Sequence, residues 1–121
     1  MIHFPILRTR RLTAQLRELF GGEELPQFSE STPRHVEDLA SLLAQDRERG
    51  YAMGEGFYEP SVSSIAAPVR GGSGQVVAGL AVAIPFTELV PEKTQLWAQQ
   101  VQEAAETLSG HLRQQHPDLL R

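Results

Sequence analysis

The amino-acid sequence predicts an α+β domain in which an antiparallel sheet packs against helices. Two stretches rich in β-compatible residues flank a glycine-rich turn, and residues with helical periodicity lie both before and after them. The length of 121 residues, with 40% hydrophobic and 21% charged residues, suits one domain with a modest core. We therefore expect residues 1–121 to form a single domain.

The first helix is expected from Thr9 to Phe20, where leucines recur at helical spacing. Gly21 and Gly22 then supply a stop signal. The segment from Glu23 to Ser31 has no sustained period and is interpreted as a connection. Leu25 and Phe28 are expected to anchor this connection to the core.

A second helix is expected to begin at Thr32 and Pro33, with the threonine as its cap and the proline in its first turn. Its apolar face consists of Val36, Leu39, Ala40 and Leu43. Arg47 and Arg49 suit the negative end of the helix dipole, and Gly50 is able to adopt the left-handed conformation that ends a helix.

A short strand is expected over Tyr51–Met53, followed by a loop from Gly54 to Pro60. A β-hairpin is expected next, with strands Val62–Val69 and Val76–Ile84 around a glycine-rich turn. Pro68 has no backbone N–H, so its strand needs a free edge or a bulge at that position.

The last helix is predicted from Glu92 to Gln115, after Pro91 and before Pro117. One stripe of this helix is apolar. The residues of the stripe are Trp97, Val101, Ala104, Ala105, Leu108 and Leu112.

The composition argues against several classes of protein. The formal net charge of −4 argues against a surface that binds nucleic acid throughout. The chain has no cysteine, which excludes disulfides and thiol catalysis and is compatible with a reducing cytoplasm. The N-terminus has no signal-peptide pattern, and the longest apolar run, Val76 to Ile84, is too short to cross a membrane. We expect a soluble cytoplasmic protein.

No motif predicts catalysis, a cofactor or a metal. The glycine-rich segment 71–74 lies between strands and lacks the lysine of a phosphate loop. His111 and His116 are five residues apart, which places them on different faces of a helix. The cluster of Arg8, Arg10, Arg11 and Arg17 is interpreted as the solvated face of the first helix. An enzyme is therefore not expected.

Three ordered blocks carry a resemblance to a known family. They are residues 39–52, which contain Arg-Gly-Tyr-Ala, residues 61–70, which contain Ile-Ala-Ala-Pro-Val, and residues 74–85, the second hairpin strand. Over about Leu25 to Leu112 the chain resembles the effector-binding domain of the IclR family of transcriptional regulators. The usual helix-turn-helix and the first strands of that domain have no counterpart in these 121 residues, so the chain is expected to be an N-terminally truncated fragment.

The resemblance implies a GAF-like fold in a cytoplasmic bacterial repressor or activator. It also implies a pocket for a small metabolite, of the organic acid or aromatic catabolite class. A homodimer or tetramer is expected, with DNA contact only through a helix-turn-helix domain absent from this chain. No membrane partner is expected.

Two features depart from the family pattern. The family commonly writes its last strand as Ala-Leu-Ser-Val-Ser-Gly-Pro, and here Ala81 and Ala83 replace the two serines. The loop from Gly54 to Glu59 is also less acidic than is usual in the family. A less polar ligand, or an empty site, is therefore expected.

The second hairpin strand predicts where a pocket would lie. Because side chains alternate along a strand, Gly79, Ala81 and Ala83 share a nearly bare face. If Val62 and Ser64 pair onto that face, the sheet forms a concavity that the loop from Met53 to Pro60 can cover. The candidate ligand-binding residues are Met53, Gly54, Glu55, Tyr58, Val62, Ser64, Gly79, Ala81 and Ala83, with Ser61 as a further polar anchor.

Two alternatives stay open. The small residues fit equally a helix that packs tightly across them. The whole chain also fits an interaction module that binds nothing small and dimerises through a free strand edge or the Trp97 stripe. A sensor predicts a closed concavity with convergent polar groups, whereas the interaction module predicts side chains that fill the same volume.

Overall fold

Helices lie at both ends of the chain and strands lie between them in the computed structural model, which describes the backbone of residues 3–115 and the side chains of residues 11–115. The helices are α1 (His3–Phe20), α2 (Val36–Arg49) and α3 (Pro91–Gln115). The strands are β1 (Ala52–Glu55), β2 (Val62–Arg70) and β3 (Val76–Pro85), followed by the short helix η1 (Phe86–Glu88). The predicted α+β class and order of elements are confirmed. Among the described residues, no helix has the length and hydropathy needed to cross a membrane.

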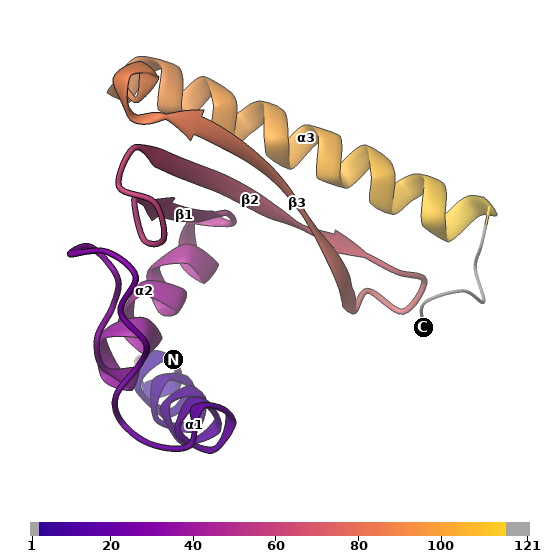
Figure 1. Cartoon of the computed structure of the whole chain (residues 1–121). Coiled ribbons are helices and arrows are strands. Elements are labelled where there is room, and N and C mark those ends of the chain that lie inside the picture. Colours follow the sequence, from indigo (N-terminus) through magenta and orange to yellow (C-terminus); the bar gives the residue numbers. More distant parts are fainter. Residues whose placement is uncertain (1–2, 116–121) are drawn as a thin grey trace.

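The three strands form one antiparallel sheet in the order β1-β2-β3 (Figure 1). The predicted hairpin is confirmed, and each of its strands runs one residue further than expected. β1 pairs with β2 only as far as Ala66, so Pro68 has no strand partner on that side. The expected free edge at Pro68 is therefore confirmed, and the register also shifts just beyond it, between Val69 and Arg70.

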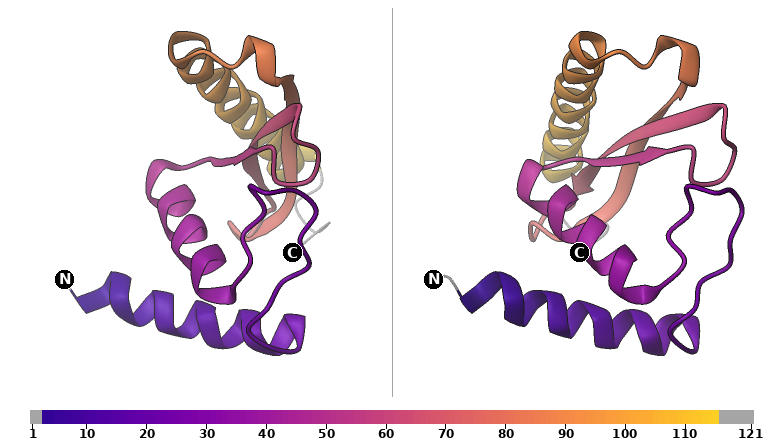
Figure 2. Two further views of the ribbon diagram at one scale, coloured as in Figure 1. Left: turned by 60° about the vertical axis from the view of Figure 1, so that its left-hand side comes forward. Right: turned by 90° about the vertical axis from the view of Figure 1, so that its left-hand side faces the viewer.

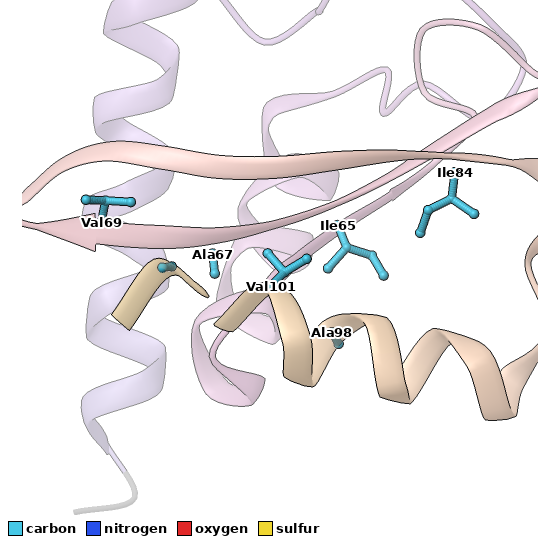
Figure 3. Close-up of a cluster of buried hydrophobic side chains, with 7 residues drawn as sticks. Ile65, Ala67, Val69, Ile84, Ala98 and Val101 are labelled. Carbon is cyan, nitrogen blue, oxygen red and sulfur yellow. The ribbon is translucent and has the colours of Figure 1, made fainter. Parts of the chain in front are cut away.

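The main core lies between the sheet and α3, which runs along the hairpin (Figure 1). Every second residue of β2 is buried, from Ser63 through Ile65 and Ala67 to Val69. Figure 3 shows the aliphatic side chains of this row together with those of α3 and β3. The buried cluster is Ile65, Ala67, Val69, Ile84, Ala98, Val101 and Ala105.

The apolar stripe of α3 is narrower than predicted. Val101 and Ala105 are buried as expected, but Ala104 is exposed and Leu108 is 42% exposed. Ala98 and Ser109 are buried in their place. The reason is that α3 packs mainly on β2 and much less on β3. The side of the helix that is turned toward β3 therefore stays uncovered.

A second, smaller core joins α1 to α2 (Figure 2). Leu16, Val36 and Ala40 are buried there, and Leu25 packs against them as expected. α1 begins at His3 and not at Thr9, which places Pro5 in the first turn, where a missing N–H is harmless. Phe28 was predicted to anchor the connection to the core, and this prediction is wrong. It is 60% exposed, and its ring centroid lies 5.0 Å from that of Tyr58.

The predicted cap at Thr32 is wrong. α2 begins at Val36 with His35 as its N-cap residue, and no side chain caps it. The Thr32 hydroxyl instead accepts the backbone N–H of Ser29 at 2.9 Å and donates to the carbonyl of Phe57. Its tertiary hydrogen bond to the loop after β1 replaces the local one that the sequence pattern predicts.

The predicted end of α2 is confirmed. Gly50 has φ of 88°, in the left-handed region, and donates its N–H to the carbonyl of Asp46. The strand that follows is shifted from the prediction of Tyr51–Met53. Gly54 and Glu55 belong to β1 because they pair with Ser64 and Ser63, so the ladder overrides the low strand propensity of glycine.

Ser109 of α3 links this helix to the last residue of β2. Its Oγ accepts the backbone N–H of Arg70 at 2.9 Å and donates to the carbonyl of Ala105 at 2.7 Å. We expect Ser109→Ala to lower the free energy of unfolding by about 1–3 kcal/mol, because it leaves the Arg70 N–H without this acceptor. Chemical denaturation measures this. Thr107→Ala is the control, since the exposed Thr107 hydroxyl makes only the local bond to Glu103, and it is expected to cost less than about 0.5 kcal/mol. An equal cost for both variants would contradict the assignment.

Candidate functional site

The face of the sheet turned away from α3 carries only small residues in its centre. Directly opposed residues of antiparallel strands share a face, so the register defines three rows across the sheet. The rows are Gly54–Ser64–Ala83, Ala52–Ala66–Ala81 and Pro68–Gly79. We call these eight residues the small-residue face. No side chain in it is larger than that of proline.

The small-residue face is open to solvent among the residues that the structure describes. Ser64, Gly79, Ala81 and Ala83 are all exposed, and a Cβ at Gly79 would meet no atom within 4 Å. The alternative that a helix packs tightly across these residues is therefore wrong for the described part of the chain, since α3 lies on the opposite side. The closed concavity that a sensor predicts is not formed either.

The loop after β1 bounds one end of this face. A Cβ built at Gly54 would lie 3.2 Å from Cδ2 of Phe57 and 3.4 Å from Oγ of Ser64, so the aromatic ring stands beside the first row. The loop is held there by hydrogen bonds from Ser29 to the carbonyl of Gly56 and from Thr32 to that of Phe57. Because Gly54 has no side chain, the ring of Phe57 has room beside the first row.

The end of α2 bounds the opposite end of the face. A hollow of about 590 Å³ lies there, with floor residues from the second and third rows and a wall from α2. It is lined by Leu43, Asp46, Arg47, Tyr51, Ala52, Ala66, Ala67, Pro68, Val76, Val77, Ala78 and Gly79. Most of this lining is apolar, and the charges come from α2 alone.

Two of the three charges near this hollow are already paired. Asp46 forms an ion pair with Arg49. The guanidinium of Arg49 also lies 4.9 Å from the ring centroid of Tyr51. Arg47 forms neither an ion pair nor a hydrogen bond with any residue in the described part of the chain. The hollow therefore combines an apolar floor with one unpaired cation at its rim.

The structure brings together six of the nine predicted site residues. Gly54, Ser64, Gly79, Ala81 and Ala83 lie in the rows of the small-residue face, and Val62 extends the face beyond Ser64 by pairing with Pro85. Of the polar side chains that were expected to converge on this face, only Ser64 lies on it, and Glu55, Tyr58 and Ser61 do not.

The other three predicted residues point elsewhere. Met53 pairs with Ile65 and packs against the buried cluster under α3, and Glu55 pairs with the buried Ser63, so both belong to the opposite face. Tyr58 is 74% exposed, and its ring contacts Phe28. Ser61, the further anchor, donates its hydroxyl to Glu59 at 3.1 Å. The prediction for these residues depended on a loop from Met53 to Pro60 that covers the face, whereas the register places Gly54 and Glu55 in β1 and turns Met53 and Glu55 toward the opposite face.

The arginine cluster of α1 has a structural role at one position. Arg17 forms ion pairs with Glu23 and, at 3.5 Å, with Glu37, and so joins α1 to the connection and to α2. Arg11 is exposed, and the side chains of Arg8 and Arg10 lie outside the described residues. Of the two histidines considered above, His111 is exposed on α3 and His116 lies outside the described residues. No group of three His, Asp or Glu residues suited to a metal occurs in the described part of the chain.

Comparison with known proteins decides the family. A sequence model described as "Bacterial transcriptional regulator IclR C-terminal" matches residues 6–110. The chain belongs to the IclR C-terminal domain family. The match begins nearer the N-terminus than the resemblance at Leu25 suggested, so it includes most of α1. The family is one of transcriptional regulators and not of enzymes, as expected.

Two curated relatives come from Escherichia coli K12. The HTH-type regulator KdgR is 29% identical over 98 residues, which cover 81% of this chain and 37% of KdgR. The HTH-type regulator XynR is 31% identical over 99 residues, which cover 82% of this chain and 39% of XynR. The chain thus spans about two fifths of the length of these IclR-family relatives.

Solved structures of IclR-family domains have the same fold. The C-terminal domain of E. coli KdgR matches with a TM-score of 0.74 and 28% identity, over 89% of this chain and 66% of that one. An IclR homologue from Microbacterium hydrocarbonoxydans, solved in complex with 4-hydroxybenzoate, matches with a TM-score of 0.71 and 29% identity, over 83% of this chain and 40% of that one. The α+β arrangement of this chain is therefore that of IclR C-terminal domains.

Sequence reasoning missed three residues at the boundary of the small-residue face of this IclR-family domain. They are Phe57, Leu43 and Arg47. Phe57 gave a usable signal, because it is an aromatic residue in a glycine-bounded loop directly after the second helix and strand. Leu43 and Arg47 gave none, since helical periodicity explains the leucine as core and the helix dipole explains the arginine.

Proposed function

We propose that this chain is the effector-binding part of an IclR-type bacterial transcriptional regulator and that its ligand lies on the small-residue face. In this proposal the protein is cytoplasmic and forms a homodimer or tetramer. DNA contact is made through a helix-turn-helix domain outside these 121 residues. Ligand binding changes promoter occupancy.

The observation that carries the proposal is the breadth of the small-residue face. The eight residues of the three rows form an open floor, and the hollow lies over part of it. A bulky side chain bounds each end of this face, Phe57 at one end and Leu43 at the other. Ligand sites are usually apolar hollows with a few polar groups that fix orientation. Ser64 and Arg47 are the polar groups that this face offers.

The charges favour a ligand that carries a carboxylate. Arg47 lies in the last turn of α2, whose C-terminal end bears a partial negative charge that disfavours anions. The unpaired guanidinium offsets this and provides a planar donor that matches a carboxylate. The apolar floor suits a hydrocarbon or aromatic body. The IclR homologue solved with 4-hydroxybenzoate supports this ligand class, because that molecule combines both features.

A thermal-shift experiment tests the proposal. The purified chain is screened against 4-hydroxybenzoate, benzoate and short aliphatic acids, with 4-hydroxybenzamide as the neutral analogue. A ligand at about 100 times its Kd adds about 2.7 kcal/mol to the stability of the folded state, which raises the melting temperature by several degrees. We expect such a shift with at least one acid. A melting temperature unchanged by every acid would count against the proposal.

Arg47→Gln tests the predicted contact with the carboxylate. We expect the affinity for a binding acid to fall about threefold to tenfold, which corresponds to roughly 0.7–1.4 kcal/mol for a partly exposed charged contact. Arg113→Gln on α3 removes the same charge far from the face and is expected to leave affinity unchanged. Calorimetric titration measures both variants. An equal loss for the two would show that net charge alone sets the affinity.

A second candidate function is an interaction module that binds nothing small. The free outer edge of β3 favours it, since no described strand pairs there.

A further inference from the structure

The small-residue face is longer than a single aromatic ring. Residues on one face of a strand are two positions apart, so the rows lie about 7 Å apart and the face extends about 13 Å from the row of Ser64 to that of Pro68. The middle row consists of Ala52, Ala66 and Ala81, so only methyl groups stand between the two ends. A benzoate-sized acid covers about one of the two intervals between rows.

The ring of Phe57 closes one end of this floor. It lies beside the first row, where a Cβ at Gly54 would be 3.2 Å from its Cδ2. The same ring lines, with Leu42 of α2, a second hollow of about 500 Å³. Leu43, the next residue of α2, lines the hollow over the second and third rows, and none of the described residues lines both hollows. Phe57 therefore stands between the sheet and α2 as a partition between two neighbouring hollows.

The connection between α1 and α2 holds this ring in place. Thr32 donates its hydroxyl to the carbonyl of Phe57 itself, and Ser29 donates its hydroxyl to the carbonyl of the preceding Gly56. The bonded residues are 25 and 27 positions apart in the sequence, so the loop is fixed to a separate part of the fold. Two such bonds on consecutive carbonyls restrict how far the ring can withdraw from a ligand.

We propose that Phe57 determines the length of the acid that binds on the small-residue face, and that the site takes an elongated acid of about eight to ten carbons. The inference rests on the function proposed above and narrows its ligand class. The carboxylate lies at Arg47, which lines the same hollow as the third-row residues Pro68 and Gly79. The apolar chain extends over the alanine row to the ring of Phe57. An extended carbon chain advances about 1.3 Å per carbon, so about eight to ten carbons cover most of the length of about 13 Å.

A series of straight-chain acids, from butyrate through hexanoate, octanoate and decanoate to dodecanoate, tests the proposal by calorimetric titration. We expect the affinity to rise about twofold per added carbon, because a chain on an open face buries about half of each CH₂ group. The rise should stop at octanoate or decanoate, where the chain reaches the ring. Equal affinity for short and long acids, or a rise that continues through dodecanoate, would overturn this inference and leave the proposed function standing. The absence of binding by every acid, benzoates included, would contradict both.

Phe57→Ala identifies the ring as the group that limits the length. The substitution should join the two hollows, so that dodecanoate binds more tightly than decanoate. Phe57→Trp enlarges the ring, should move the limit to shorter acids, and keeps the test decisive if the alanine variant does not fold by circular dichroism. Tyr58→Ala removes a 74% exposed ring from the same loop and should leave the limit unchanged. A limit that is the same in both Phe57 variants as in the wild type, or that moves equally in Tyr58→Ala, would overturn the proposal.

Discussion

Ile65→Ala should lower the free energy of unfolding by about 2–5 kcal/mol, a large share of the roughly 5–15 kcal/mol expected for a domain of this size. Ile65 has no exposed surface and lies in the middle strand, between the sheet and α3 (Figure 3). Truncation leaves a cavity beside Val101 and Ile84, which α3 cannot close without shifting along the strand. Urea denaturation followed by circular dichroism measures the loss.

Leu19→Ala is the matched control for this result. Leu19 is an aliphatic residue of α1 that is 75% exposed, so its truncation should change stability by about 0.5 kcal/mol or less. If Ile65→Ala and Leu19→Ala cost the same, the core between the sheet and α3 would not be the one described.

Ala81→Trp should abolish ligand binding while the chain stays folded. Ala81 is exposed in the central row of the small-residue face, and no described element packs over it, so an indole is able to lie on the face without displacing the core. The same indole occupies the volume that a ligand needs. We expect affinity for a binding acid to fall at least about tenfold, or 1.4 kcal/mol or more. Calorimetric titration, with circular dichroism to verify folding, measures the effect.

Two controls separate blocking from other effects of the substitution. Ala14→Trp makes the same change at an exposed position of α1 and should leave binding intact. Ala81→Ser adds a hydroxyl on the same face without filling it and should also preserve binding. Unchanged affinity in Ala81→Trp would place the ligand elsewhere on the molecule.

Much of the fold was predictable because it depends on local patterns. The hairpin follows from two β-rich stretches around a glycine-rich turn, and the end of α2 follows from the left-handed conformation at Gly50. The predictions failed where tertiary contacts replaced local ones. Thr32 bonds to the loop after β1 and not to a helix N-terminus, and Gly54 enters a strand because β2 offers it a partner.

The arrangement of the candidate site was predictable within the hairpin but not beyond it. Alternation along β3 placed Gly79, Ala81 and Ala83 on one face, and the register extended that face to Ser64 and Gly54. Strand alternation within one segment cannot fix the pairing of a neighbour, which is why the sequence did not show that Met53 and Glu55 face the opposite side of the sheet. The role that we propose for Arg47 depends on how α2 lies against the sheet, and no local pattern encodes that placement.

The central claim is that an acid binds on the small-residue face, and an amide NMR titration tests it most directly. With ¹⁵N-labelled chain and 4-hydroxybenzoate, or the acid with the largest thermal shift, we predict that the amide signals of Gly54, Ser64, Gly79 and Ala81 move. Trp97, the one tryptophan of the chain, packs against the buried cluster between the sheet and α3, on the other side of the sheet, so its indole N–H signal should not move. Shifts centred on Trp97, or no shifts at the four amides with any acid, would contradict the claim.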